Sequence, residues 1–149
     1  MRAKLLTLAW LIIAVPSFAV ASNGPERVRK SELSKHPFAV GQLKLTITYF
    51  HAGLPLLSHV VIEVKVENPS GSAEVFDPNL LSLVSKNNSQ VHVAGRIQSF
   101  VHSNARLGPA HTRSVAPGAH MKEYFEFTGR VKLPARLFYD GKELAVITD

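Results

Sequence analysis

The sequence contains no cysteine, and this absence excludes disulfide bonds. Many small domains in oxidising compartments depend on disulfides, so a domain of this composition has to rely on its hydrophobic core. After the first 21 residues, no apolar run approaches the length of a membrane-spanning helix. There is also no cysteine behind the apolar N-terminus to carry a lipid. We therefore expect the mature chain to be released as a soluble protein, without stable membrane insertion.

Recognisable catalytic motifs are missing as well. The sequence has no G-x-S-x-G motif around a nucleophilic serine and no glycine-rich phosphate loop. Most carboxylates fall on the polar side of alternating segments or in turns, where pairing with Lys65, Lys122 or Lys142 explains them. Two carboxylates acting as a glycosidase pair are an open alternative, although nothing in the spacing selects a pair. We predict that the protein is not an enzyme and needs no cofactor.

Residues 1–21 have the three parts of a signal peptide for export. Arg2 and Lys4 supply the positive start, the apolar run LLTLAWLIIAV follows, and an A-V-A triplet ending at Ala21 places small residues where signal peptidase cleaves. The alternative is a membrane anchor, but eleven residues cover only about 16 Å as a helix, roughly half of a hydrocarbon core. We predict cleavage after Ala21.

Export without disulfides, together with an A-x-A cleavage site, indicates a protein of the bacterial cell envelope. A periplasmic and an extracellular location agree equally well with these residues. Cleavage of 21 residues from the chain of 149 leaves 128, a length at which a domain buries roughly two-thirds of its unfolded surface. One domain with its own core is therefore expected.

The mature chain begins with a polar segment and then changes pattern. Residues 22–36 are charged and lack apolar periodicity, so we predict a flexible charged leader, with a short helix around 26–33 as an alternative. From Pro37 onward, apolar and polar residues alternate. In HVVIEVKVE (59–67), the apolar residues share one face of a strand but scatter around a helix. The same pattern predicts strands over 42–50, 74–76, 80–85, 89–101, 120–128, 135–139 and 142–148.

Turn residues separate these segments. Asp140-Gly141 predicts a two-residue hairpin, because both positions of such a turn need a positive φ. Pro117-Gly118 suits a type II turn, Asn87-Asn88 another tight turn, and Gly95 a bulge within its strand. Short strands at near-regular intervals without a long helix predict an all-β protein. We assign residues 37–149 to an immunoglobulin-like antiparallel β-sandwich domain.

Four segments between residues 62 and 142 occur in a familiar order: IEVKVENPSG, FDPNLLSLVSKNNSQV, APGAHMKEYFEF and LPARLFYDGK. This order resembles the immunoglobulin-like domain of uncharacterised secreted bacterial proteins and lipoproteins. The mycobacterial immunoprotective extracellular antigen is similar in fold. The resemblance implies a β-sandwich, and it implies no catalytic residues. Lipoprotein members carry a lipidated cysteine that this chain lacks, so the resemblance does not imply a membrane tether.

Basic residues are concentrated in one part of the chain. Residues 96–136 hold seven lysines and arginines against only Glu123 and Glu126. We predict that Arg106, Arg113 and the loop from Gly108 to His120 form a contact surface for an unknown protein or an anionic envelope component. An ordinary solvated surface is the alternative. Nucleic acid is not expected as a partner, because basic and aromatic residues are not interleaved. The predicted function is thus that of an exported interaction or accessory module.

Histidines provide the alternative function. The chain has seven histidines, but their spacing contains no H-x-H or H-x-x-x-H pair of the kind that holds zinc or copper. His111 and His120 could meet across the turn at residues 117–118, and Met121 would add a soft ligand for copper. These three residues predict, as the alternative, a periplasmic carrier of copper or zinc.

Overall fold

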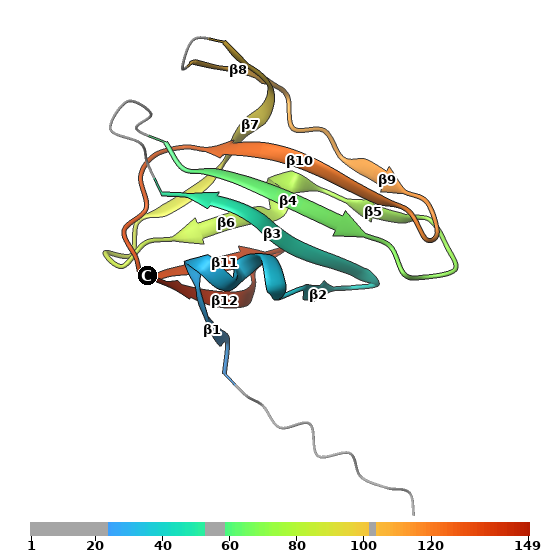
Figure 1. Ribbon diagram of the computed structural model, residues 1–149, viewed down its shortest axis with the longest axis horizontal. Coiled ribbons are helices and arrows are strands. Elements are labelled where there is room, and N and C mark those ends of the chain that lie inside the picture. The colour runs from blue at the N-terminus through green and yellow to red at the C-terminus, as the bar shows by residue number, and fades with distance from the viewer. Residues whose placement is uncertain (1–23, 53–58, 102–103) are drawn as a thin grey trace, which may run out of the picture.

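The computed structural model describes residues 24–52, 59–101 and 104–149 (Figure 1). The predicted signal peptide and its cleavage site after Ala21 lie outside the described residues. No helix within these ranges is long and apolar enough to cross a membrane. The regular structure of the described chain is mainly β-strand. Its strands are β1 (Glu26–Arg29), β2 (Phe38–Val40), β3 (Leu43–His51), β4 (Val61–Glu67), β5 (Glu74–Phe76), β6 (Leu81–Val84), β7 (Gln90–Val101), β8 (Asn104–Gly108), β9 (Arg113–Val115), β10 (His120–Phe127), β11 (Ala135–Tyr139) and β12 (Lys142–Thr148), with the short 3-10 helices η1 (Lys30–Lys35) and η2 (Pro78–Leu80).

The strands form a strongly curled sheet in the order β1-β12-β11-β6-β7-β10-β4-β3-β2, and β5 pairs with β9 in a second, small sheet. The strand β7 connects the two halves of the large sheet. Its start pairs with β6 and its middle pairs with β10. Figure 1 shows β3, β4 and β10 in one layer and β6, β11 and β12 in the other. The all-β sandwich predicted from the alternating segments is confirmed.

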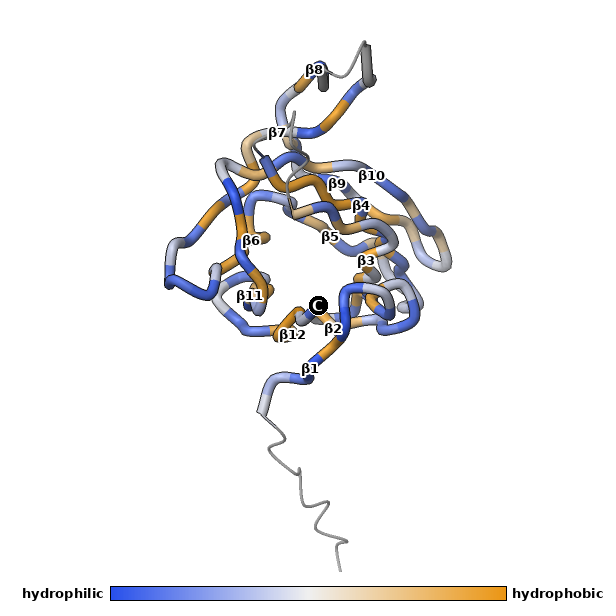
Figure 2. The backbone as a smooth tube through the Cα atoms, turned by 60° about the vertical axis from the view of Figure 1, so that its left-hand side comes forward, coloured by the Kyte–Doolittle hydropathy of each residue, from blue (hydrophilic) through white to orange (hydrophobic). Residues whose placement is uncertain are grey.

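Apolar side chains of both layers fill the interior, around which the strands are arranged in Figure 2. Phe76 of β5 connects the layers, because its ring centroid lies 5.8 Å from that of Tyr139 on β11 and 6.3 Å from that of Phe125 on β10. All three rings are buried. Each buried aromatic side chain contributes roughly 1.5–3 kcal/mol of transfer free energy before chain entropy is counted. The contact explains why these three short or irregular strands stay together.

Asn68, at the end of β4, is a buried polar side chain whose hydrogen bonds are all made. Its Nδ2 donates to the carbonyl oxygens of Ser72 and Val115, at 2.7 and 2.8 Å, and its Oδ1 accepts from Ser70. Its main chain is also hydrogen-bonded, to Ala119 and Gly118. A buried amide is costly unless it is satisfied in this way. Asn68 therefore joins the end of β4 to the turn between β9 and β10.

The turn predictions are confirmed where the structure describes them. Asp140 and Gly141 both have positive φ, at 49° and 72°, as a two-residue hairpin requires. Gly118 has a φ of 69°, and the Ala119 N–H donates to the carbonyl of Ala116 at 3.0 Å across the turn. Asn88 also has a positive φ, of 62°. Local turn chemistry was therefore readable from the sequence.

The prediction of a flexible leader over residues 22–36 is wrong for the part from Glu26 to Lys35. β1 pairs with β12 at one end of the large sheet, and β2 pairs with β3 at the other end. η1 connects them and buries Leu33, which is 1% exposed. Residues 26–40, called the N-terminal strap below, thus bridge the two open edges of the sandwich. The strap also makes the sheet mixed, because β1 runs parallel to β12 where an antiparallel sandwich was predicted.

Replacing Leu33 by alanine tests the role of the strap. Removal of a buried leucine side chain should lower the free energy of unfolding by about 2–5 kcal/mol, because the cavity between the layers is not refilled. Urea unfolding of the processed protein measures this change. Ser34→Ala, at the adjacent exposed position, is the matched control and should change stability by less than about 0.5 kcal/mol. Equal midpoints for the two variants would show that the strap is a leader after all.

Tyr139 should make stability fall at alkaline pH. Burial raises the pKa of Tyr139 above its usual value, and its hydroxyl accepts the Asp77 N–H at 3.1 Å. The folded state therefore keeps the phenol proton to a higher pH than the unfolded chain, so this stabilisation is complete below about pH 10 and is lost as the pH rises further. Tyr139→Phe should be less stable by about 1 kcal/mol at neutral pH. Its deficit should shrink above pH 10 in urea unfolding, and a constant deficit would contradict the argument.

Candidate interaction surface

A two-stranded arm projects from the sandwich. It consists of Arg96–Val101 of β7 and Asn104–Gly108 of β8, which pair antiparallel. Figure 1 shows the arm at the top of the molecule, beyond the layer of β10 and β4. Among the described strands, β8 pairs only with β7. The outer edge of β8 therefore has no neighbouring strand among the described ones, and Ile97–Val101 of β7 also lack one on the side away from β8.

Two glycines determine where the arm leaves the sandwich. A Cβ atom on Gly95 would lie 2.8 Å from the carbonyl oxygen of Gly108, closer than a side chain tolerates. A Cβ on Gly108 would lie 2.1 Å from the amide nitrogen of Gln98. At Gly95 the obstacle is backbone, so glycine is needed there for β7 and β8 to approach in this way, whereas at Gly108 the exposed Gln98 side chain would have to move. The approach occurs where β7 stops pairing with β10 and continues with β8.

A bulge next to Gly95 changes which side of the sheet the following residues face. Glu126 pairs with Gly95, but Phe127 pairs with Val93, so Ala94 is the additional residue. Arg96 consequently pairs with Phe125 and lies on the side of the buried phenylalanine. Uninterrupted alternation from His92 would place Arg96 on the polar side of β7, and the bulge is the reason that it does not lie there. The predicted bulge itself is confirmed.

Arg96 and Arg113 share one carboxylate. Glu123 Oε1 lies 3.5 Å from Arg96 Nη1 and 3.0 Å from Arg113 Nη2. The Glu123 side chain is 13% exposed, and the two arginine side chains are 32% and 38% exposed. Three further atoms of this group, Arg96 Nε, Arg113 Nε and Glu123 Oε2, are buried without a hydrogen-bond partner. Arg113, predicted as a contact residue, is thus held by Glu123 and connects β9 to β10.

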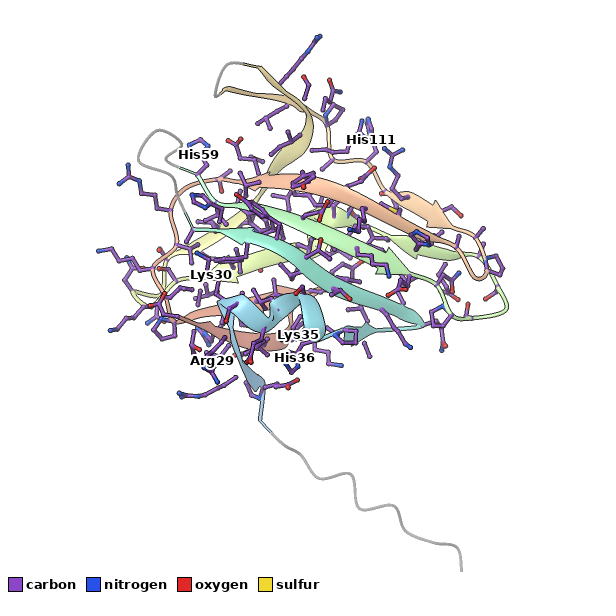
Figure 3. The ribbon with its side chains drawn as sticks, viewed as in Figure 1. Arg29, Lys30, Lys35, His36, His59 and His111 are labelled. Carbon is purple, nitrogen blue, oxygen red and sulfur yellow. The ribbon has the colours of Figure 1, made fainter. Side chains whose placement is uncertain are left out.

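Arg106 lies in the arm and is exposed. No ion pair involves Arg106 in the described ranges. Every lysine or arginine charge in residues 78–122 is without an acidic neighbour in that stretch, because it contains no aspartate or glutamate. His111 is exposed on the same side of the molecule as the arm, whereas Arg29, Lys30, Lys35 and His36 surround η1 on the opposite side (Figure 3). The structure therefore separates the two predicted contact residues, since Arg106 is free and Arg113 is paired.

The outer face of β3, β4 and β10 differs from the arm, because its charged side chains form ion pairs. Glu67 lies 2.8 Å from Lys65, whose hydrogen bond holds the pKa of Glu67 below its usual value. Glu63 lies 3.8 Å from Lys122, and His59 contacts the buried Glu126. Pairing of carboxylates with Lys65 and Lys122 was predicted from the sequence; the Lys122 pair crosses from β10 to β4, whereas Lys65 and Glu67 both belong to β4. A face neutralised in this way offers little net charge to a partner.

The residues of the alternative metal site belong to two parts of the fold, because His120 and Met121 begin β10 and His111 lies in the segment before β9. His120 begins β10 and pairs in register with Glu67 of β4, whereas His111 precedes β9, which belongs to the small sheet. Met121 packs against the core. Within residues 24–52, 59–101 and 104–149, no group of three or more histidine, aspartate or glutamate side chains is arranged to hold a metal ion. Binding of copper or zinc by His111 and His120 stays a prediction without a structural observation in its favour.

One open cleft contains the residue types of a hydrolytic triad. The cleft, of about 390 Å³, is lined by Ser82, His92 and Asp140 among others. Ser82 Oγ accepts a hydrogen bond from Gln90 Nε2 at 3.2 Å. Ser82 and His92 are partners in the β6–β7 ladder, but in the part of the chain that the structure describes no hydrogen bond connects their side chains. A nucleophile needs such a base within hydrogen-bond distance, so this cleft shows no activated serine.

Comparison with known proteins finds a distant structural neighbour. No family model matches the chain, and no curated protein matches it. The crystal structure of the yjhA protein from Bacillus subtilis is similar with a TM-score of 0.47 and 15% sequence identity, covering 70% of this chain and 76% of that chain. The fold of the chain is that of an all-β sandwich.

Replacing Glu123 by glutamine tests the shared carboxylate. Arg96 and Arg113 would lose their common partner while staying partly buried, so the free energy of unfolding should fall by about 1–3 kcal/mol. Glu67→Gln is the control, because it removes a carboxylate from an exposed pair worth less than about 1 kcal/mol. Urea unfolding compares the two. Equal losses would show that Glu123 contributes no more than a surface charge.

Proposed function

We propose that the protein is an exported, non-enzymatic interaction module of the bacterial cell envelope, and that the arm contacts an anionic partner. The scaffold is a sandwich whose core is apolar and whose outer face of β3, β4 and β10 carries paired charges. The arm differs from both, since it projects from the sandwich and carries an exposed cation. Its role in this proposal is to present side chains and backbone to a partner without performing a reaction.

The observation that carries the proposal is the charge around Arg106. The 45 residues of the stretch 78–122 include no carboxylate, so no acidic residue of this stretch offsets the charge of Arg106. Arg106 has no ion pair among the described residues, in contrast to Arg96 and Arg113. Clusters of one sign attract partners of the opposite sign and accelerate their association. An anionic envelope component or an acidic protein fits this surface.

The resemblance to secreted bacterial immunoglobulin-like proteins and lipoproteins is part of the same proposal. It is supported by the sandwich architecture and by the turns at residues 117–118 and 140–141, which occur where the shared segments require them. The signal-like residues 1–21 support export to the periplasm or the medium. The proposed partner is therefore a molecule outside the cytoplasm.

Charge reversal at Arg106 tests the proposal. Arg106→Glu in the processed protein should abolish retention on envelope fractions at about 10 mM ionic strength, where charges act over roughly 30 Å. Arg113 is left unchanged in this experiment, because Arg113→Glu would place a second carboxylate beside Glu123 and destabilise the fold. Sedimentation of the fractions with bound protein provides the measurement.

Lys86→Glu is the matched control. Lys86 is exposed in the turn before β7, at the other end of the same strand from the arm, and lies in the same stretch without carboxylates. The net-charge change is identical in both variants. A local contact at the arm is supported if the Lys86→Glu variant is retained on the envelope fractions and the Arg106→Glu variant is not. Unchanged retention of Arg106→Glu would eliminate the arm as the contact surface.

A further inference from the structure

We infer that the partner binds as an additional β-strand along the free edge of β8, in the form of an extended segment in which acidic and apolar residues alternate. The inference deepens the proposed function and rests on it, because the charge of the segment follows from the contact at Arg106. It adds what the charge alone does not specify, namely the conformation of the partner and the backbone atoms that it contacts.

The backbone of β8 is available for such pairing. An edge strand presents unpaired N–H and C=O groups, which a peptide in extended conformation satisfies by forming a further ladder. Five described strands have a single partner: β1, β2, β5, β8 and β9. Of these, β8 is the longest, with five residues. Five residues span about 17 Å and offer alternate backbone groups along that length.

The position of β8 also favours the addition of a strand. β1 and β2 belong to the strap that bridges the sandwich, and β5 and β9 have three residues each. The arm instead projects away from both layers, so a segment can lie along β8 without displacing another element (Figure 1). A two-stranded ribbon alone is only marginally stable in water, and a third strand adds to its stability.

Two side chains of β8 indicate the chemistry of the incoming segment. Arg106 is exposed, and its neighbour Leu107 is 40% exposed although it is apolar. Consecutive residues of a strand point to opposite faces. Residues of an added strand opposite Arg106 should therefore be acidic, and those opposite Leu107 should be apolar. A peptide that alternates glutamate with a β-branched apolar residue meets both conditions.

A second copy of this chain fits the edge less well. If two β8 strands paired around Arg106, the two guanidinium groups would lie opposite each other, and like charges in that position are destabilising. No carboxylate of residues 78–122 is present to offset them. The charge pattern therefore favours an acidic partner over self-association.

The test uses the processed protein and a blocked seven-residue peptide of alternating glutamate and valine. The control peptide has the same glutamates, with proline in place of valine, so it keeps the charge but cannot donate backbone hydrogen bonds at those positions. At about 0.15 M ionic strength, where surface charges are screened beyond roughly 8 Å, the valine peptide should bind at least about tenfold more tightly than the proline peptide. Amide hydrogen exchange should slow at alternate residues of Asn104–Gly108 when the valine peptide is bound.

The outcomes separate the strand addition from the proposed function. The strand addition is overturned if the two peptides bind with equal affinity and the β8 amides are not protected. An anionic contact at the arm would still be supported if Arg106→Glu weakened the binding of both peptides. Binding of phosphatidylglycerol vesicles without amide protection leads to the same conclusion. Dimerisation of the free protein through β8, seen as concentration-dependent protection of the same amides, also overturns it. If Arg106→Glu changes the binding of neither the peptides nor the vesicles, the proposed function itself is contradicted.

The variants with substitutions at Arg106 and Lys86 must be folded for these comparisons. Arg106→Glu changes an exposed side chain and should keep the dispersed amide spectrum of the parent protein. Lys86→Glu again serves as the charge-matched control, and it should bind the valine peptide with the parent affinity. Arg106→Gln distinguishes loss of the cation from introduction of a repulsive charge, and it should weaken binding less than Arg106→Glu does.

Discussion

The close approach of β7 and β8 at Gly95 and Gly108 is the constraint on which the candidate surface depends. Gly95 has no room for a Cβ atom because the Gly108 carbonyl oxygen occupies the space, and at Gly108 the Gln98 side chain would have to move. The bulge beside Gly95 rotates the chain, so that Arg96 turns toward Glu123 while the following residues leave the sandwich. One local feature thus produces the arm and places an arginine at its base.

The rest of the sandwich keeps this feature in place. Phe76 packs between Tyr139 and Phe125 and so connects the two layers in the interior. At the opposite side, the N-terminal strap bridges the open edges and buries Leu33. The absence of disulfides is compatible with this architecture, because burial of apolar side chains supplies the stability that cross-links supply in smaller exported domains.

Charge is distributed unevenly over this scaffold, and the distribution has a physical consequence. The outer face of β3, β4 and β10 pairs its carboxylates with lysines and histidine, and Glu123 holds two arginines at the base of the arm. Arg106 is left without a carboxylate. Paired charges contribute to register and solubility, whereas an unpaired cation on a projecting edge is available to a partner. This difference is the reason for placing the contact at the arm.

Most strands and turns were predictable from the sequence, because alternation and turn formation are local properties. The Asp140-Gly141 hairpin and the valine strand before Asn68 are examples. Glu123 could have been recognised too, since it occupies the phase of Met121 and Phe125 in β10. The parallel pairing of β1, the side to which Arg96 turns and the free edge of β8 were decided only by the tertiary structure. Each depends on contacts between residues far apart in the chain, which no local pattern contains.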